Sequence, residues 1–138
     1  MIHIRKLAPE DWDWIQRIEP INWTSDTCGL VAIDDKSEKV VGALVMYDFS
    51  VNSAYCHTII ENPMALRKKH LETVFDYVFN SCGLKILLGH VLSTNTRSLH
   101  VLKKLGFKKH SWVVDGIEDG VHEVKVILKR EDCKYLRK

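Results

Sequence analysis

Hydrophobic and polar residues alternate with two different periods along this chain of 138 residues. Short alternating or continuous apolar runs predict strands at 2–7, 28–34, 39–49, 53–61, 84–92, 107–114 and 121–130. Apolar residues at helical spacing predict helices at 9–19, 64–80 and 96–104. The expected order is β-α-β-β-β-α-β-α-β-β, a mixed α/β (α+β) sheet of about seven strands flanked by three helices. One domain spans 1–138, and we expect its basic tail at 129–138 to fray.

The first two predicted helices each have one apolar face. Pro9 at the first turn is typical of a helix start, and a proline at position 20 marks the end. In this first helix Trp12, Ile15 and Ile18 mark one face. The second helix has apolar residues at i, i+3, i+4 and i+7, namely Leu71, Val74, Phe75 and Val78.

The third helix lies in the stretch STNTRSLHVLKKLGF, residues 93–107, directly after an apolar strand. Asn95 can cap this helix with its side-chain oxygen. Gly106 suits the left-handed geometry of a helix end. Ligands of α/β sheets bind beyond the carboxyl ends of strands, where helix N-termini attract anions. The capped helix is therefore a candidate wall of a ligand site.

Composition and charge exclude several classes of protein. The chain is 46% hydrophobic and carries a net charge of +2, so no global field draws it to nucleic acid. No apolar run approaches the roughly 20 residues of a membrane span, and the N-terminus does not resemble a signal peptide. The four cysteines and seven histidines show no metal-ligand spacing. We expect a cytoplasmic protein with reduced thiols, no metal, no membrane partner and no nucleic-acid partner.

The string N-x-x-S-x-x-x-L-x-K-L-G-F, which begins at Asn95 and ends at Phe107, resembles the C-terminal motif of the GNAT acyltransferase superfamily. Its nearest counterpart is the branch that acetylates protein N-termini. The segment IRKLAPEDWDWI resembles the first strand and helix of that family, with its R-x-x-x-x-x-D pattern. Gly42 lies where that family usually has the glycine of its third strand, and the segment 113–131 resembles its terminal hairpin. The resemblance implies the GNAT fold and transfer of an acetyl group from acetyl-CoA to a primary amine by direct attack.

The resemblance also implies where acetyl-CoA lies, namely in a cleft where the fourth and fifth strands splay apart. Its pantetheine arm pairs with the main chain of the fourth strand. The residues implied for this arm are Thr58, Ile59, Ile60, Asn95, Arg97 and Ser98. The amine acceptor is a protein N-terminus, a lysine or a small amine.

The loop before the second helix departs from the family pattern Q/R-x-x-G-x-G/A, which holds the pyrophosphate. Aligned from Arg67, the glycine positions carry His70 and Glu72. Arg67, Lys68, Lys69 and His70 instead form a basic cluster at the first turn, where the helix dipole disfavours cations. Either the cluster holds the CoA phosphates, or it is a solvated basic face.

A general base is expected near the acceptor amine. By position on the fourth strand and by its imidazole chemistry, His57 is the first candidate. Glu61 and Tyr55 follow, because all three share one face of a regular strand. The alternative is a half-buried strand histidine without a catalytic role. Many family members carry a tyrosine as general acid where this chain has Leu102.

A second class of function stays open, a catalytically degenerate GNAT-like module with a structural or binding role. The missing glycines and Leu102 favour it. Compact GNAT-like proteins of this size occur in tailed bacteriophages, where one type resembles a virion component. The partner is then a protein or a virion assembly, located in the virion or the infected host. Four tryptophans are interface candidates or core residues: Trp12, Trp14, Trp23 and Trp112.

Overall fold

A computed structural model describes residues 1–136 of the chain. The elements in chain order are β1 (Ile2–Lys6), α1 (Trp12–Ile18), β2 (Cys28–Asp34), β3 (Val40–Tyr47), β4 (Ser53–Ile60), α2 (Lys68–Asp76), β5 (Ile86–Leu92), α3 (Thr96–Leu105), β6 (Lys108–Glu118) and β7 (Val121–Lys129). This order confirms the predicted α/β fold with seven strands and three helices.

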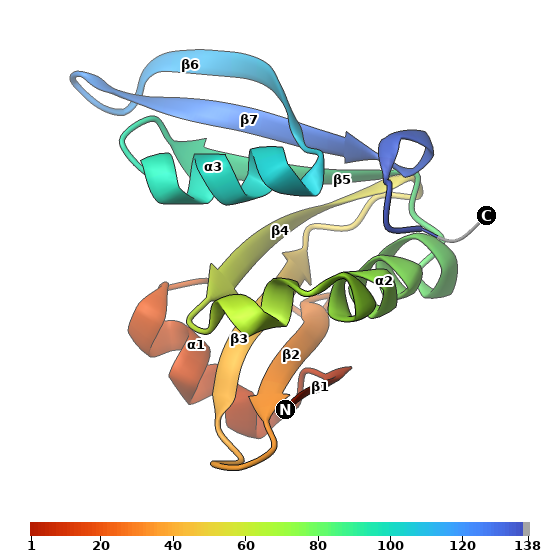
Figure 1. Ribbon diagram of the computed structural model, residues 1–138. Helices are drawn as coiled ribbons and strands as arrows, with labels where there is room; N and C mark the ends of the chain where they lie inside the picture. Colours follow the sequence, from red (N-terminus) through yellow and green to blue (C-terminus); the bar gives the residue numbers. More distant parts are fainter. Residues whose placement is uncertain (137–138) are drawn as a thin grey trace.

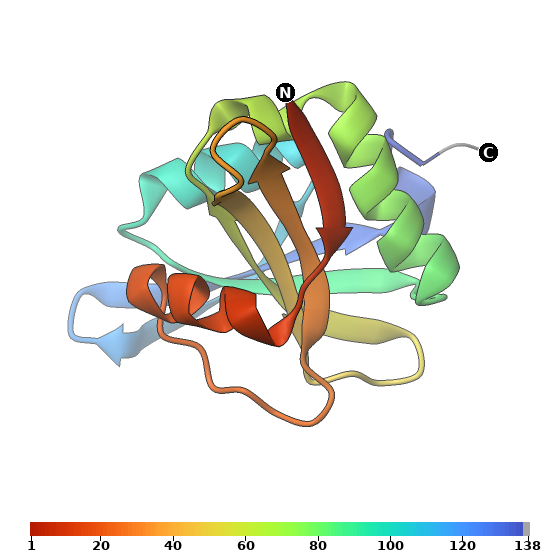
Figure 2. The same cartoon turned by 90° about the horizontal axis from the view of Figure 1, so that it is seen from below.

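All seven strands form one mixed sheet in the order β1-β2-β3-β4-β5-β7-β6. Neighbouring strands are antiparallel except β4 and β5, which are parallel. Helix α1 covers one face of the sheet, and α2 and α3 cover the other (Figures 1 and 2). The core is correspondingly divided, with a large apolar cluster beneath α2 and α3 and a smaller one beneath α1.

The second helix begins later than its apolar pattern predicts. Residues Pro63–Leu66 form a separate 3-10 turn, in which the Asn62 side chain accepts a hydrogen bond from Met64 N at 3.0 Å. Arg67 is extended, and α2 starts only at Lys68. A proline turn therefore divides the expected helix at 64–80, while the apolar face predicted for α2 is confirmed as packed against the core.

The apolar face of α1 is buried at Ile15 and open at Ile18. Ile15 is fully buried and Trp12 is half-buried, but Ile18 is 49% exposed. The physical reason is position, because Ile18 ends the helix and faces an open cleft instead of the sheet.

The R-x-x-x-x-x-D pattern of the N-terminal segment joins β1 to the start of α1. Arg5 donates two hydrogen bonds to the Asp11 carboxylate, at 2.7 and 2.8 Å, and Ala8 N donates a third at 2.8 Å. Asp11 is only 3% exposed. Burial opposes its ionisation, but the bonds from Arg5 and Ala8 outweigh that effect, so the pKa of Asp11 is lowered. The pair fixes the angle at which α1 leaves the sheet.

The expected fraying of the tail at 129–138 is wrong for the part that the structure describes. Cys133 and Leu136 are buried, and the Tyr135 ring stacks on Phe75 with a centroid distance of 5.8 Å. Arg130 donates a hydrogen bond to Asn80 Oδ1 at 2.7 Å. Apolar residues thus hold the segment against α2 up to Leu136. Residues 137–138 lie outside the described part of the chain.

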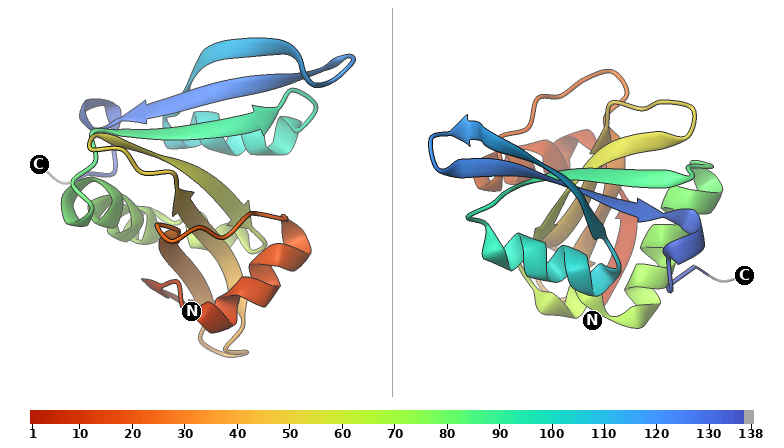
Figure 3. Two further views of the ribbon diagram at one scale, coloured as in Figure 1. Left: turned by 180° about the vertical axis from the view of Figure 1, so that it is seen from behind. Right: turned by 90° about the horizontal axis from the view of Figure 1, so that it is seen from above.

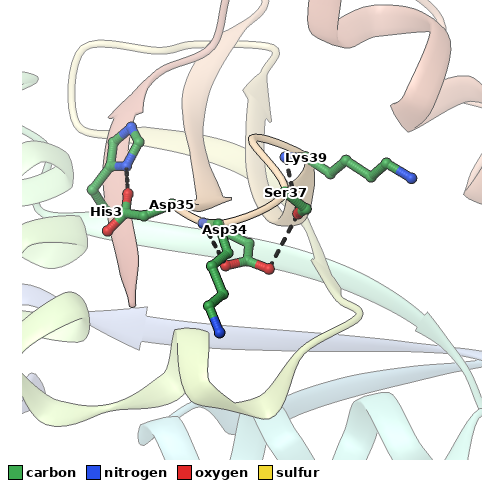
Figure 4. A network of polar contacts seen from close by, with 6 residues as sticks. His3, Asp34, Asp35, Ser37 and Lys39 are labelled. Carbon is green, nitrogen blue, oxygen red and sulfur yellow. Dashed lines mark hydrogen bonds and ion pairs between the residues drawn. The ribbon is translucent and has the colours of Figure 1, made fainter.

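Polar side chains close the β2–β3 hairpin (Figure 4). The Asp34 carboxylate accepts hydrogen bonds from Lys36 N at 3.2 Å and from the Ser37 hydroxyl at 3.1 Å. Ser37 Oγ in turn accepts one from Lys39 N at 3.3 Å. These local hydrogen bonds give main-chain N–H groups of the turn acceptors, and the antiparallel pairing of β2 with β3 confirms the predicted hairpin.

Candidate active site

The two halves of the sheet separate between β4 and β5 (Figures 1 and 3). Parallel pairing joins Ser53–Cys56 to Ile86–Gly89 and then stops. Beyond this point lies a cleft made of two adjoining hollows, an inner one of about 410 Å³ and an outer one of about 360 Å³. Both hollows are lined by Glu19, Thr58, Asn95 and Ser98. The cleft thus draws its walls from α1, β4 and α3.

The main chain of β4 leaves hydrogen-bonding groups on the cleft side. Glu61 N donates to Val41 O at 2.9 Å, which marks a hydrogen-bonded pair of the β3–β4 ladder. Such pairs alternate along an antiparallel ladder, so Ile59 and His57 also direct their main-chain groups to β3. Thr58 and Ile60 therefore direct theirs towards β5, where no strand pairs with them.

Helix α3 forms the opposite wall of the cleft. Asn95 Oδ1 accepts a hydrogen bond from Ser98 N at 3.1 Å, which confirms the predicted N-cap. Gly106 ends the helix with φ of 107°, as predicted. The outer hollow is lined by all six residues expected along the pantetheine arm: Thr58, Ile59, Ile60, Asn95, Arg97 and Ser98.

The basic cluster before α2 is placed differently. Arg67, Lys69 and His70 line a separate hollow of about 100 Å³ together with Asp34, and neither hollow of the cleft is lined by any of the four cluster residues, Lys68 included. His70 is buried there, and burial, followed by the charges of Lys69 and Arg67, lowers its pKa. The contact of this cluster with CoA phosphates stays a prediction.

The start of α2 can still receive an anion through its main chain. Arg67 occupies the N-cap position, and its side chain makes no capping hydrogen bond. His70 N and Leu71 N already donate hydrogen bonds to Arg67 O, at 2.9 and 3.0 Å, which leaves the N–H groups of Lys68 and Lys69 at this end. The helix dipole adds a partial positive charge there, and such an end attracts anions.

His57 lies in the inner hollow with a carboxylate partner. Its Nδ1 is 2.8 Å from Glu19 Oε1, and its ring stacks on Tyr47 with a centroid distance of 5.2 Å. The side chain is 23% exposed. A carboxylate on Nδ1 fixes the ring orientation and directs Nε2 away from Glu19. The sequence marks Glu19 only as a helix end, and no local pattern links it to His57.

The other two candidate bases are placed less favourably. Tyr55 is half-buried, stacks between Tyr47 and His90 at centroid distances of 6.0 and 4.5 Å, and lines neither hollow. Glu61 is exposed beyond the end of β4 and also lines neither hollow. Of the three residues predicted on one face, only His57 therefore reaches the cleft.

Two further features of the inner hollow bear on its chemistry. Burial, with a smaller effect of Glu19, raises the pKa of the Cys56 thiol to about 12. This cysteine therefore stays protonated and is a poor nucleophile. Leu102 is buried in the same hollow and offers no hydroxyl.

No metal site is apparent within residues 1–136, since no group of three or more His, Cys, Asp or Glu side chains is arranged to hold an ion. In the same residues no helix is long and apolar enough to cross a membrane.

Comparison with known proteins gives a family and several structural neighbours. The family described as acetyltransferase (GNAT) domain matches residues 5–108. No curated protein sequence matches the chain. Two solved variants of the spermidine N-acetyltransferase SpeG from Vibrio cholerae superpose with TM-scores of 0.79 and 0.77 at 15% identity, each covering 99% of this chain and 96% of theirs. A third solved variant of SpeG superposes with a TM-score of 0.77 at 14% identity, and the match covers 95% of this chain and 96% of the SpeG chain. At this identity the likeness establishes the fold.

Proposed function

Because the chain belongs to the acetyltransferase (GNAT) domain family, whose activity transfers an acyl group to an amine, we propose that it takes an acetyl group from acetyl-CoA bound in the β4–β5 cleft. The observation that carries this proposal is the end of β4–β5 pairing at Cys56 and Gly89. It opens a cleft beside free main-chain groups and an N-capped helix. The alternative of a degenerate module gains no support from the comparisons, and a virion role or a cytoplasmic location stays a prediction.

The residues of the cleft fit acetyl-CoA. The main chain of Thr58 and Ile60 can pair with the amides of the pantetheine arm, and Asn95 and Ser98 border the same path. The uncapped start of α2 suits the pyrophosphate. When bound, the cofactor supplies an acetyl group activated as a thioester.

His57 is proposed as the general base for the attacking amine. With Nδ1 held by Glu19, the free Nε2 can take the proton that the amine loses as it forms the new C–N bond. Cys56 is a protonated, buried thiol, which favours direct attack over an acetyl-enzyme intermediate. Glu61 and Tyr55 are not assigned a step.

For the acceptor we propose a cationic primary amine. The inner hollow contains two carboxylates, Glu19 and Glu123, and both attract a positive charge. The structural neighbours are named as spermidine N-acetyltransferases, so spermidine is the first acceptor to test.

Thermal unfolding in the presence of acetyl-CoA or CoA tests cofactor binding. A ligand at 100 times its Kd stabilises a protein by about 2.7 kcal/mol. Small domains gain roughly 2–8 °C in Tm per kcal/mol, so we expect a rise of several degrees. An unchanged Tm at millimolar acetyl-CoA contradicts the proposal.

Asn95→Ala tests the α3 wall. Loss of the N-cap is expected to lower the free energy of unfolding by about 1 kcal/mol. It should also reduce the Tm rise that acetyl-CoA produces, because the first turn of α3 borders the cofactor path. The matched control is Asn22→Ala, in an exposed loop. Equal acetyl-CoA affinity in both variants would remove Asn95 from the cofactor site.

A further inference from the structure

The inner hollow contains a second histidine–carboxylate pair to which the proposed function assigns no step. His90 lies on β5, and its Nδ1 contacts a carboxylate oxygen of Glu123 on β7. Cys56 and Gly89 form the last rung of the parallel pairing. His57 and His90 are therefore the first residues of the two strands beyond that rung. Both line the inner hollow, each with its own carboxylate.

The His90 side chain lines the inner hollow with atoms other than Nδ1. Nδ1 is buried and makes no geometrically regular hydrogen bond within the described residues, whereas the side chain as a whole is 33% exposed. The ring plane is fixed by stacking on Tyr55 at a centroid distance of 4.5 Å and an interplanar angle of 11°.

Titratable groups on two strands face His90. On β7, Glu123 contacts the ring, and Lys125 is the register partner of His90, with its ammonium 5.7 Å from the centre of the Tyr55 ring. On β4, the neighbouring titratable groups are Tyr55 and His57.

We propose that His90 is a second catalytic residue of the transfer, the general acid that protonates the sulfur of CoA as it leaves. This inference rests on the proposed function. Two other side chains of the hollow are unsuited to this role, because Leu102 has no proton to donate and burial holds Cys56 as a weakly acidic thiol. Glu123 is then a positioning residue that holds His90.

The proton transfers balance across the two histidines. The amine nitrogen forms a bond to the thioester carbon and gives one proton to His57. As the tetrahedral intermediate collapses, the C–S bond breaks, and its electron pair takes a proton from Nε2 of His90. The products are the acetamide and the free CoA thiol. His57 then loses its proton to solvent and His90 regains one.

The test is steady-state acetyl transfer from acetyl-CoA to spermidine by wild type and His90→Gln, with His100→Gln on the exposed face of α3 as control. We expect His90→Gln to lower kcat by about 100-fold or more, with the KM for acetyl-CoA and its Tm shift unchanged. Glu123→Gln should produce a smaller loss of kcat.

Three results overturn the inference. One is a kcat of His90→Gln equal to that of His100→Gln while wild type is active, which leaves the proposed function intact. Another is a His90→Gln variant that also loses the Tm shift with acetyl-CoA, since His90 would then support cofactor binding and not the transfer step. The third is absence of transfer by wild type, which overturns the proposed function together with the inference.

Discussion

Replacement of His57 by glutamine is expected to lower kcat for acetyl transfer by about 100- to 10,000-fold, the range for loss of a general base. The expectation rests on the inner hollow, where His57 is the β4 side chain that combines a free ring nitrogen with a carboxylate partner, Glu19. Glutamine keeps a polar side chain of similar reach but cannot take a proton. Acetyl-CoA binding, measured by Tm shift, should persist.

Two further variants test whether the loss of kcat is specific to His57 and its carboxylate partner. His100→Gln removes an exposed imidazole of α3 and should leave kcat unchanged. Glu19→Gln keeps the shape of the partner but weakens its hold on Nδ1, so kcat should fall by less than in His57→Gln. A turnover of His57→Gln equal to wild type would remove the general-base assignment.

The largest expected effect on stability comes from Asp11→Ala. It leaves the Arg5 guanidinium and Ala8 N without the carboxylate that accepts their hydrogen bonds. Breaking a buried ion pair by removing one partner costs roughly 3–5 kcal/mol. Because Arg5 is 37% exposed and regains water, we expect about 3 kcal/mol from urea unfolding at neutral pH. Asp13→Ala, an exposed aspartate of the same helix, should change stability by about 0.5 kcal/mol or less.

The same contact predicts an acid dependence. The folded pKa of Asp11 lies below its unfolded value, so its stabilisation is complete above the ordinary aspartate pKa and is lost as pH falls through the folded pKa. The difference in unfolding free energy between wild type and Asp11→Asn should therefore narrow in acid. A difference that stays constant from neutral to strongly acidic pH would contradict the role given to Arg5.

The order of elements could be predicted from the sequence because periodicity is a local signal. Leu71 and Phe75 mark the buried face of α2 wherever the helix begins. Its start could not be predicted in the same way, because a 3-10 turn at Pro63 and an extended Arg67 interrupt a continuous apolar pattern. The prediction that the tail frays is wrong because it rests on the polar composition of the segment. Composition does not show that Leu136 packs against the core.

The site was predictable only where its residues belong to one strand or one helix end. Asn95 and Ser98 form a cap with a recognisable spacing. Glu19 and Glu123 carry no such signal, since each meets its histidine only when distant segments are folded together. No sequence pattern marks His90 as a site residue, because it is a single histidine within an apolar strand. Pairing of strands, not spacing in sequence, brings it beside His57.

The most direct test of acetyl transfer in the β4–β5 cleft is to incubate the protein with acetyl-CoA and spermidine and to quantify both products by mass spectrometry. We expect free CoA and N-acetylspermidine in equal amounts, with both formed about 100- to 10,000-fold more slowly by His57→Gln. Bound acetyl-CoA without any acetylated amine, for spermidine and for other primary amines alike, would contradict it.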